Sequence, residues 1–236
     1  HFGGSLLNDE VTIGNMSGRE WASDTISQLK KMPNVIVKNR SQVFGYYDHN
    51  MTVMFERVSD HVENPSKYTP RQRLHYIRAG EVIVSTGSIE RPISFGNNDR
   101  PGIFLSSAAR EYMKVYETLV GKKPIIFTNN DSAYATALEF IKNDINPIIV
   151  DTRDGSDGQL VKEVQDLGIK IRFKSGIANT KGHLKIKSAT IGTLDSEKEK
   201  FIALEEVDCD CICMSGGWTP TVHLSSQSGN KLKFNE

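Results

Sequence analysis

The chain has 236 residues, of which 38% are hydrophobic and 25% are charged. This composition excludes a disordered chain, and the length fits one large domain or two small ones. Lys and Arg number 29, as do Asp and Glu, so charge gives no reason to expect nucleic acid or an anionic membrane as a partner.

The hydropathy and the beginning of the chain exclude further classes. No apolar run approaches the ~20 residues that span a bilayer. The opening His1-Phe2-Gly3-Gly4 lacks the Met, the basic region and the apolar region of a signal peptide, and we interpret the chain as a segment of something longer. The three clustered cysteines do not make a disulfide framework, which fits a reducing, cytoplasmic location.

The first part of the chain predicts a helix and several strands. Ser17-Gly18-Arg19-Glu20 forms a capping box that opens a helix, and Pro33 ends it. Residues 43–47 and 51–55 are predicted to form a hairpin. Residues 82–84 are continuously apolar, as expected of a strand buried on both faces. This run is the centre of a strand predicted at residues 81–85, and further strands are predicted at residues 35–37 and 75–78.

From residue 105 the hydrophobic period changes. Residues 105–119 fit one helical face, with Ser106 as a possible cap. Strands and helices then alternate, with strands at 124–127, 147–150 and 169–173 and helices at 132–142 and 156–167. This βαβαβ order predicts a parallel sheet with right-handed crossovers. An antiparallel meander is predicted over 177–194 and 201–205, and a last apolar strand at 209–214.

Two glycine turns organise the chain. Thr86-Gly87 and Ser215-Gly216-Gly217 each end an apolar strand, where glycine lets backbone approach a phosphate. They flank the βαβαβ unit, and this layout resembles the two-dinucleotide flavoprotein reductases of the glutathione and thioredoxin reductase class. We expect an α/β fold with an outer FAD/NAD-binding domain, residues 1–110 and 207–236, whose N-terminal dinucleotide fold is truncated. Residues 111–206 are expected to form an inserted NAD(P)-type Rossmann-like domain that includes the meander.

The turn Thr128-Asn129-Asn130-Asp131-Ser132-Ala133 stands where the reductases have a glycine-rich turn. Thr128 and Asn130 replace two glycines, whereas Ala133 still permits close helix packing. Asp151, at the end of the next strand, is positioned like a ribose-binding carboxylate. The turn is either a working nicotinamide site, with the helix N-terminus facing phosphate, or a retained scaffold that no longer binds. The negative charge that Asp131 would place near a pyrophosphate is an argument for the scaffold.

The other reactive side chains indicate no catalytic or metal site. Cys209, Cys211 and Cys213 alternate along a strand, so we expect all three to face one side as buried structural thiols. The chain has no C-x-x-C spacing, which argues against a zinc site and against a disulfide reductase. The histidines have no ligand spacing either, and His223 is the one expected closest to a bound nucleotide.

Several strings together resemble the α subunit of heterotetrameric sarcosine oxidase. They are Gly3-Gly4-Ser5-Leu6-Leu7, Val43-Phe44-Gly45-Tyr46-Tyr47-Asp48, Ser85-Thr86-Gly87 with Glu90-Arg91-Pro92, Asn97-Asn98-Asp99-Arg100-Pro101-Gly102, Thr128-Asn129-Asn130-Asp131-Ser132-Ala133-Tyr134, and Gly216-Gly217-Trp218-Thr219-Pro220 with Val222-His223-Leu224. Their order and spacing hold over nearly the whole chain.

The resemblance implies a longer α subunit that assembles with β, γ and δ subunits and binds NAD in the outer domain. The NAD-side positions that it implies are Gly4, Ser5, Val43, Thr86, Gly87, Gly217, Leu224 and Ser226. It also implies FAD on the β subunit and covalent FMN at the α/β interface. The implied reaction converts sarcosine to glycine, hydrogen peroxide and formaldehyde, or methylenetetrahydrofolate when folate is present.

Two alternatives share the fold. One is the α subunit of a related amine or opine dehydrogenase, and the other is a non-catalytic assembly scaffold whose NAD is structural. We expect the isolated chain to be inactive and to bind NAD weakly or not at all, because half of the outer site is missing from it.

Overall fold

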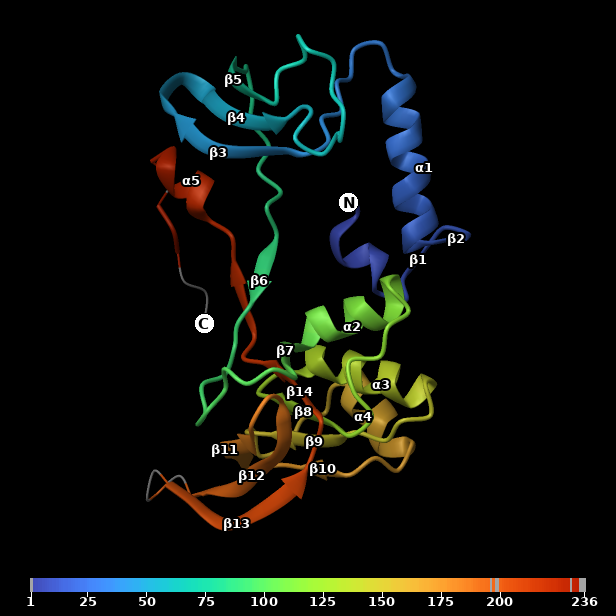
Figure 1. Ribbon diagram of the computed structural model, residues 1–236, viewed down its shortest axis with the longest axis vertical. Helices are drawn as coiled ribbons and strands as arrows, with labels where there is room; N and C mark the ends of the chain where they lie inside the picture. Colours follow the sequence, from blue (N-terminus) through green and yellow to red (C-terminus); the bar gives the residue numbers. More distant parts are fainter. Residues whose placement is uncertain (1, 196, 198–199, 230, 234–236) are drawn as a thin grey trace. The chain divides into compact units, whose positions relative to one another are not determined.

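The computed structural model describes residues 2–195, 197, 200–229 and 231–233, and it divides into two compact units (Figure 1). The first unit consists of His1–Gly3, Thr12–Ile89 and Pro220–Glu236, and the second of Gly4–Val11 and Glu90–Thr219. The second unit is therefore built almost entirely from one continuous stretch of chain.

The units follow different boundaries from the domains that the sequence predicts. Residues 90–110 and 207–219 lie in the second unit, although the expected outer domain includes them. The reason is strand pairing, since β14 (Cys211–Ser215) pairs in parallel with both β8 (Pro124–Thr128) and β7 (Ile103–Leu105). These pairings make β7 and β14 part of the inserted sheet.

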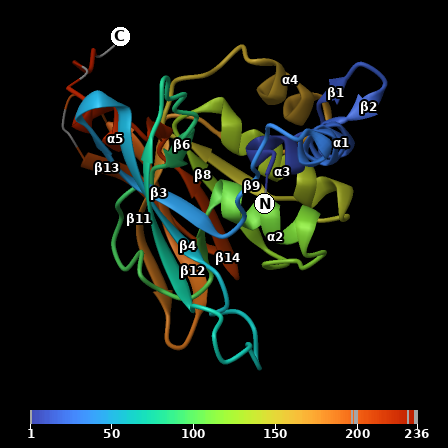
Figure 2. The same ribbon diagram turned by 90° about the horizontal axis from the view of Figure 1, so that it is seen from above.

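The second unit is a layered α/β structure. Its five-stranded parallel sheet has the order β10-β9-β8-β14-β7, with helices on one face and an antiparallel meander of order β11-β12-β13 on the other (Figures 1 and 2). The remaining bounds are β9 (Ile148–Asp151), β10 (Ile171–Arg172), α2 (Ser106–Val115), α3 (Tyr134–Lys142), α4 (Gln159–Asp166), β11 (Ser175–Gly182), β12 (Ile186–Asp195) and β13 (Lys200–Asp208). The predicted parallel sheet and meander are both confirmed.

Alternate side chains of β8 build two separate cores. Ile126 packs with helix residues such as Phe140 and Val161, whereas Ile125 and Phe127 pack with the meander. Successive side chains of a strand point to opposite faces, so a strand covered on both faces must be apolar throughout. Every residue of β8 is buried, as its apolar run predicts.

The cysteines are buried free thiols, as predicted, but they do not share one face. Cys211 and Cys213 belong to the helix-side core, whereas Cys209 belongs to the meander-side core. Cys209 precedes β14, so the alternation of that strand does not fix its direction. Burial raises the pKa of the Cys209 thiol to about 12, and the hydrogen bond with Cys211, together with burial, raises the pKa of Cys213. Protonated, buried thiols are poor nucleophiles.

Three helix starts differ from the predictions, and the first is α4, predicted from residue 156, which begins at Gln159. α2 begins after Leu105, which supplies no side-chain cap, and the Ser106 hydroxyl instead donates to Thr136 at 2.8 Å. α3 begins at Tyr134, after the 3-10 turn η3 (Asp131–Ala133). Ser106 is therefore a buried link between two helices rather than a cap.

The string from Asn97 to Gly102 fastens the meander to the sheet. Asn97 donates its side-chain amide to Asn179 at 2.7 Å, and Arg100 donates to the Gly182 carbonyl. Gly102 has a φ of +101° and lies so close to Ile186 that a Cβ would collide with that side chain. This string, prominent in the resemblance, has a structural role in the second unit.

The first unit holds α1 and a three-stranded antiparallel sheet of order β3-β4-β5. The predicted capping box of α1 is confirmed, since the Glu20 N–H donates to the Ser17 hydroxyl and the Ser17 N–H donates to the Glu20 carboxylate at 2.9 Å. The predicted hairpin is also confirmed. The bounds are β1 (Thr12–Ile13), β2 (Met16–Ser17), α1 (Gly18–Lys31), β3 (Ser41–Tyr47), η2 (Asp48–Asn50), β4 (Met51–Arg57), β5 (Gln72–Arg78) and α5 (His223–Gln227).

Two predicted strands of the first unit are wrong. Residues 35–37 and 82–84 form no strand, and the side chains of Ile36 and Ile83 are 84% and 89% exposed. A strand needs a hydrogen-bonded partner, and neither segment has one among the described residues. The apolar runs predicted buried strands, but the structure leaves Ile36 and Ile83 exposed and unpaired with any described strand.

The first unit has a sparse core. Among its described residues, the only buried apolar side chains are Ala22, Val53 and Met54. Burial of apolar surface is the main favourable term in folding, so this unit has little to offset its conformational entropy. The second unit carries both large cores.

We expect hydrogen exchange to separate the two units. Amides of β8, β9 and β14 should exchange only on global unfolding of the second unit, whereas amides of β3, β4 and β5 should exchange by easier local opening. Native-state exchange followed by mass spectrometry measures this difference. Equal protection in both units would contradict the inference from their cores.

Candidate functional site

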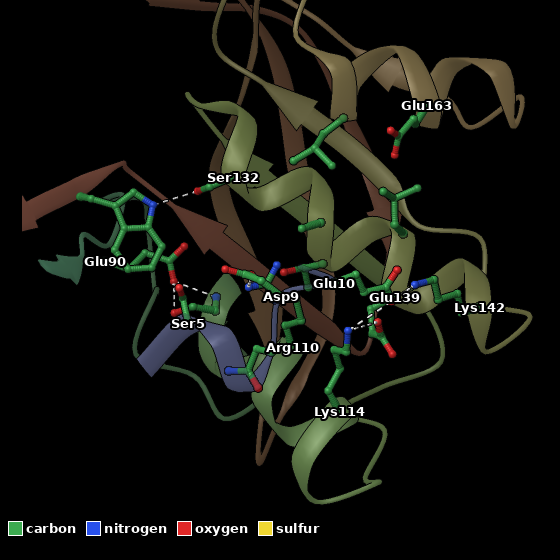
Figure 3. A pocket seen from close by; sticks show the side chains of 17 residues that line it. Ser5, Asp9, Glu10, Glu90, Arg110, Lys114, Ser132, Glu139, Lys142 and Glu163 are labelled. Carbon is green, nitrogen blue, oxygen red and sulfur yellow. Dashed lines mark hydrogen bonds and ion pairs between the residues drawn. The ribbon is translucent and has the colours of Figure 1, made fainter. Parts of the chain in front are cut away.

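A cavity of about 590 Å³ lies within the second unit (Figure 3). Its walls come from the N-terminal turn η1 (Gly4–Leu7) and the residues after it, from α2, α3 and α4, and from Trp218 of strand β15 (Trp218–Pro220). Ser5, one of the predicted NAD-side residues, lines it, and Trp218 follows another, Gly217. The cavity is therefore the place where two predicted cofactor segments meet in this unit.

The cavity lining is more acidic than basic. Its acidic side chains are Asp9, Glu10, Glu90, Glu139 and Glu163, and its basic ones are Arg110, Lys114 and Lys142. Each basic group is already paired: Arg110 with Asp9, Lys142 with Glu10, and Lys114 with Glu10 at 3.2 Å. The hydrogen bonds from Lys142 and Lys114 hold the pKa of Glu10 below its usual value. An anionic pyrophosphate would meet uncompensated negative charge here.

Glu90 is the most buried acid of this lining and is 4% exposed. Its Oε2 accepts from the N–H and the hydroxyl of Ser107, at 2.8 Å and 2.6 Å. Ser107 stands in the first turn of α2, whose own cap residue, Leu105, offers no side-chain acceptor. Glu90 ends the strand β6 (Ser88–Glu90), so a carboxylate from a distant strand caps this helix and complements its dipole.

The glycine turn at Gly216-Gly217 lets two backbone segments approach each other closely. The Gly216 N–H donates to the Arg91 carbonyl at 2.7 Å, and the Arg91 N–H donates to the Gly217 carbonyl at 2.8 Å. A Cβ on Gly216 would lie 3.0 Å from the Pro92 carbonyl oxygen, and Gly217 has a φ of +90°. The turn directs Trp218 toward η3, where its indole N–H donates to the Ser132 hydroxyl at 2.9 Å.

The first unit contains the other predicted residues. The Thr86 hydroxyl donates to the Thr221 carbonyl at 2.5 Å, and the Thr221 N–H donates to the Gly87 carbonyl at 2.8 Å. Helix α5 is tied to β3, the strand of Val43, because the Tyr46 N–H donates to the Gln227 side chain at 2.9 Å. Three segments that carry predicted residues therefore adjoin in this unit.

Individual predicted residues differ in what they offer a ligand. Gly87 has a φ of +67° and no atom within 4 Å of an added Cβ, so backbone conformation and not crowding requires glycine there. Leu224 and Ser226 lie in α5, and the Ser226 hydroxyl is used within the helix, donating to the His223 carbonyl at 2.9 Å. Gly4, Ser5 and Gly217 belong to the second unit and the others to the first, so one shared NAD site is a prediction.

In the turn at residues 128–133, which stands where the reductases have their glycine-rich turn, the polar groups hydrogen-bond to one another and to Ser215. The Asn130 side chain accepts from the Ser132 N–H at 3.1 Å, where a phosphate oxygen would accept in a nucleotide-binding turn. The same side chain donates to the Ser215 hydroxyl at 3.0 Å, and the Thr128 hydroxyl accepts from the Asn130 N–H at 3.0 Å. The residues that replaced glycine therefore form internal bonds, which favours the scaffold interpretation.

Sequence reasoning missed the contacts that build the cavity. Glu90 capping α2 could not be found because the partners are far apart in sequence. The ion pairs of Arg110 and Lys114 left only a weak signal in the sequence. These two residues are four apart, so they share a helix face, and the adjacent acids Asp9 and Glu10 supply the matching charge.

Two absences hold for the described part of the chain. No group of three or more His, Cys, Asp or Glu side chains is arranged to hold a metal ion. No helix there has the length and apolar character that crossing a membrane requires.

Known relatives match the chain along nearly its whole length. It is 35% identical over 236 residues to the sarcosine oxidase subunit alpha of Rhizobium meliloti (strain 1021), covering 97% of this chain and 22% of that protein. It is 31% identical over 225 residues to the sarcosine oxidase subunit alpha of Corynebacterium sp. (strain U-96), covering 94% and 23%. The chain thus spans between a fifth and a quarter of these relatives. No family model matches it.

Solved structures share the fold. Thioredoxin reductase from T. acidophilum has a TM-score of 0.68 at 13% identity and covers 98% of this chain, which spans 71% of that protein. Thioredoxin reductase from Lactococcus lactis has a TM-score of 0.67 at 16% identity, covering 96% and 70%. L-proline dehydrogenase from P. horikoshii has a TM-score of 0.60 at 20% identity, covering 98% and 37%. These identities speak for the fold alone.

The comparisons confirm the resemblance to the sarcosine oxidase α subunit and the reductase-like α/β fold class.

Replacing Glu90 tests its role as a helix cap. Glu90→Ala removes the acceptor of two Ser107 donors and should lower the free energy of unfolding by about 1–2 kcal/mol. Glu90→Gln keeps an acceptor and loses only the charge at the helix start, about 0.5–1 kcal/mol. Urea denaturation measures both, with exposed Glu63→Ala as a control expected to change little. A Glu90→Ala variant as stable as the control would contradict the capping role.

Proposed function

We propose that this chain, which matches a segment of the sarcosine oxidase α subunit along nearly all of its length, is the dinucleotide-binding region of such a subunit. The complete enzyme would convert sarcosine to glycine, hydrogen peroxide and formaldehyde, or methylenetetrahydrofolate with folate. The observation that carries the proposal is the similarity over 97% of the chain, together with two glycine turns in left-handed conformation.

NAD is the cofactor that we assign to the outer site, with Gly4, Ser5, Val43, Thr86, Gly87, Gly217, Leu224 and Ser226 as its contacts. The fit is better in the first unit than in the acidic cavity. Open space over Gly87 leaves its backbone accessible to a ribose or phosphate, and Val43 lies on a strand whose backbone can pair with an adenine edge. When bound, a nicotinamide dinucleotide supplies hydride-transfer chemistry or structural support.

The role of these residues is to bind and orient, since no catalytic group is assigned to the chain. The chain spans 22% of the R. meliloti subunit, so the remaining polypeptide would complete the outer domain. The β, γ and δ subunits would supply the other components, with FAD on β and FMN at the α/β interface. The cytoplasm is the proposed location.

The two alternatives predict different results for the assembled enzyme. A related amine or opine dehydrogenase would oxidise another amine faster than sarcosine, and a scaffold would keep its NAD through turnover without reduction. Assays with sarcosine and other N-methyl amino acids, combined with chromatography of the nucleotides released on denaturation, separate these cases. Preference for a different amine would overturn the assigned reaction but leave the cofactor assignment intact.

A glycine substitution tests the outer site. Gly87→Val places a branched side chain at a φ of +67° and into the open space above the turn, so bound NAD per α subunit should fall at least tenfold. Gly168→Val is the matched control, because Gly168 has a φ of +73°, equally open space, and a place at the end of α4. Chromatography of released nucleotide measures occupancy. Equal NAD content in both variants would reject the site.

The isolated chain of 236 residues should bind NAD weakly or not at all. The proposed outer site would need polypeptide beyond these residues, which span 22% of the R. meliloti subunit, and the first unit has a sparse core. Titration calorimetry checks this expectation. A dissociation constant in the low micromolar range or below would show that these residues are sufficient by themselves.

A further inference from the structure

Asp151 ends β9 and is completely buried, yet it is not free to hold a ligand. Its Oδ1 accepts from the backbone N–H and from Nε of Arg153, each at 3.0 Å. Its Oδ2 accepts from Nη2 of Arg153 at 2.7 Å and from the Tyr134 hydroxyl at 2.8 Å. Burial and the Asp151 carboxylate raise the pKa of Tyr134, so the phenol remains a donor. Both carboxylate oxygens are saturated.

The other end of the Arg153 guanidinium reaches the dinucleotide turn. Its Nη1 pairs with Oδ1 of Asp131 at 2.7 Å, and the Ser156 hydroxyl donates to the same oxygen at 2.9 Å. A Cβ on Gly158 would overlap the Asp131 carboxylate, so glycine is required where the loop passes over it. These contacts hold the loop of residues 152–158 against the turn at residues 128–133.

These groups occupy the places that a dinucleotide uses in this fold. The carboxylate after the second strand ordinarily holds the ribose, and the first helix turn holds the pyrophosphate. Here Arg153 takes the carboxylate, and Asn130 takes the Ser132 N–H. Asp131 places a negative charge beside the helix start, where a pyrophosphate would need a positive one.

We propose that Arg153 is a built-in occupant of the inserted dinucleotide fold, and that the clamp Asp131–Arg153–Asp151 excludes NAD and NADP from the turn at residues 128–133 and the carboxyl end of β9. Arg153 is a specificity-determining and positioning residue rather than a catalytic one. The inserted unit then serves as a rigid support, and nucleotide binding is confined to the outer site.

An arginine at this place could instead hold the 2′-phosphate of NADP. The geometry argues against it, because Nε and Nη2 are engaged by the Asp151 carboxylate and Nη1 by the Asp131 carboxylate. Freeing Arg153 would leave Asp151 buried with no cation. Breaking a buried pair in this way is strongly destabilising.

Chemical rescue tests the occupant directly in the whole polypeptide that carries this sequence. Arg153→Ala should lower the Tm by about 10 °C, and millimolar ethylguanidinium should restore part of the loss by entering the vacated slot. Arg172→Ala is the matched control, because Arg172 also forks a carboxylate, Glu205, but one that is largely exposed. It should lose less stability and show no rescue.

Nucleotide titration completes the test and includes a variant that keeps the charge. NADH and NADPH fluorescence should report no binding that depends on residue 153, so wild type, Arg153→Lys and Arg153→Ala should bind alike. Binding of either nucleotide that is lost in Arg153→Lys but kept in Gly87→Val would overturn the proposal, as would an absence of selective rescue. Loss in Gly87→Val alone bears only on the outer site.

Discussion

The burial of β8 and β14 on both faces is the constraint on which the second unit depends. The helices rest on one side of these strands and the meander on the other, and neither core exists without them. Their parallel register also brings Thr128 and Ser215, their carboxyl ends, to one edge of the sheet. The Asn130 amide bonds Ser215 there, so the pairing that forms the core also assembles the polar turn.

Local pattern predicted most elements of the second unit, because strands buried on both faces and amphipathic helices leave strong periodic signals. It did not predict the unit boundaries, since β14 joins β8 and β7 across long stretches of sequence. It failed at residues 82–84, where apolar character indicates a strand but no described neighbour pairs with it. Of the proposed NAD contacts, it identified the glycine turns and assigned both to the outer domain, whereas Gly217 lies in the second unit.

Glycine is required in this chain for three different physical reasons. Gly87 needs a left-handed backbone beneath open space, Gly216 needs close approach to a neighbouring carbonyl, and Gly158 makes room for the Asp131 carboxylate. Only the first is suited to receiving a ligand. A sequence motif shows that glycine is present but not why it is needed. Two strand-ending turns with similar sequences can therefore have different surroundings.

The nested order of the two units sets the sequence of events on the ribosome. The first unit is not complete until α5, made after the second unit, reaches β3, whereas residues 90–219 already contain both large cores. At roughly 5–20 residues per second, synthesis of residues 90–219 takes about 7–26 s, during which the outer hairpin lacks its last helix, and α5 follows within about 2 s. The outer hairpin, made before the second unit, is therefore the part of these two units that stays longest within reach of chaperones and proteases.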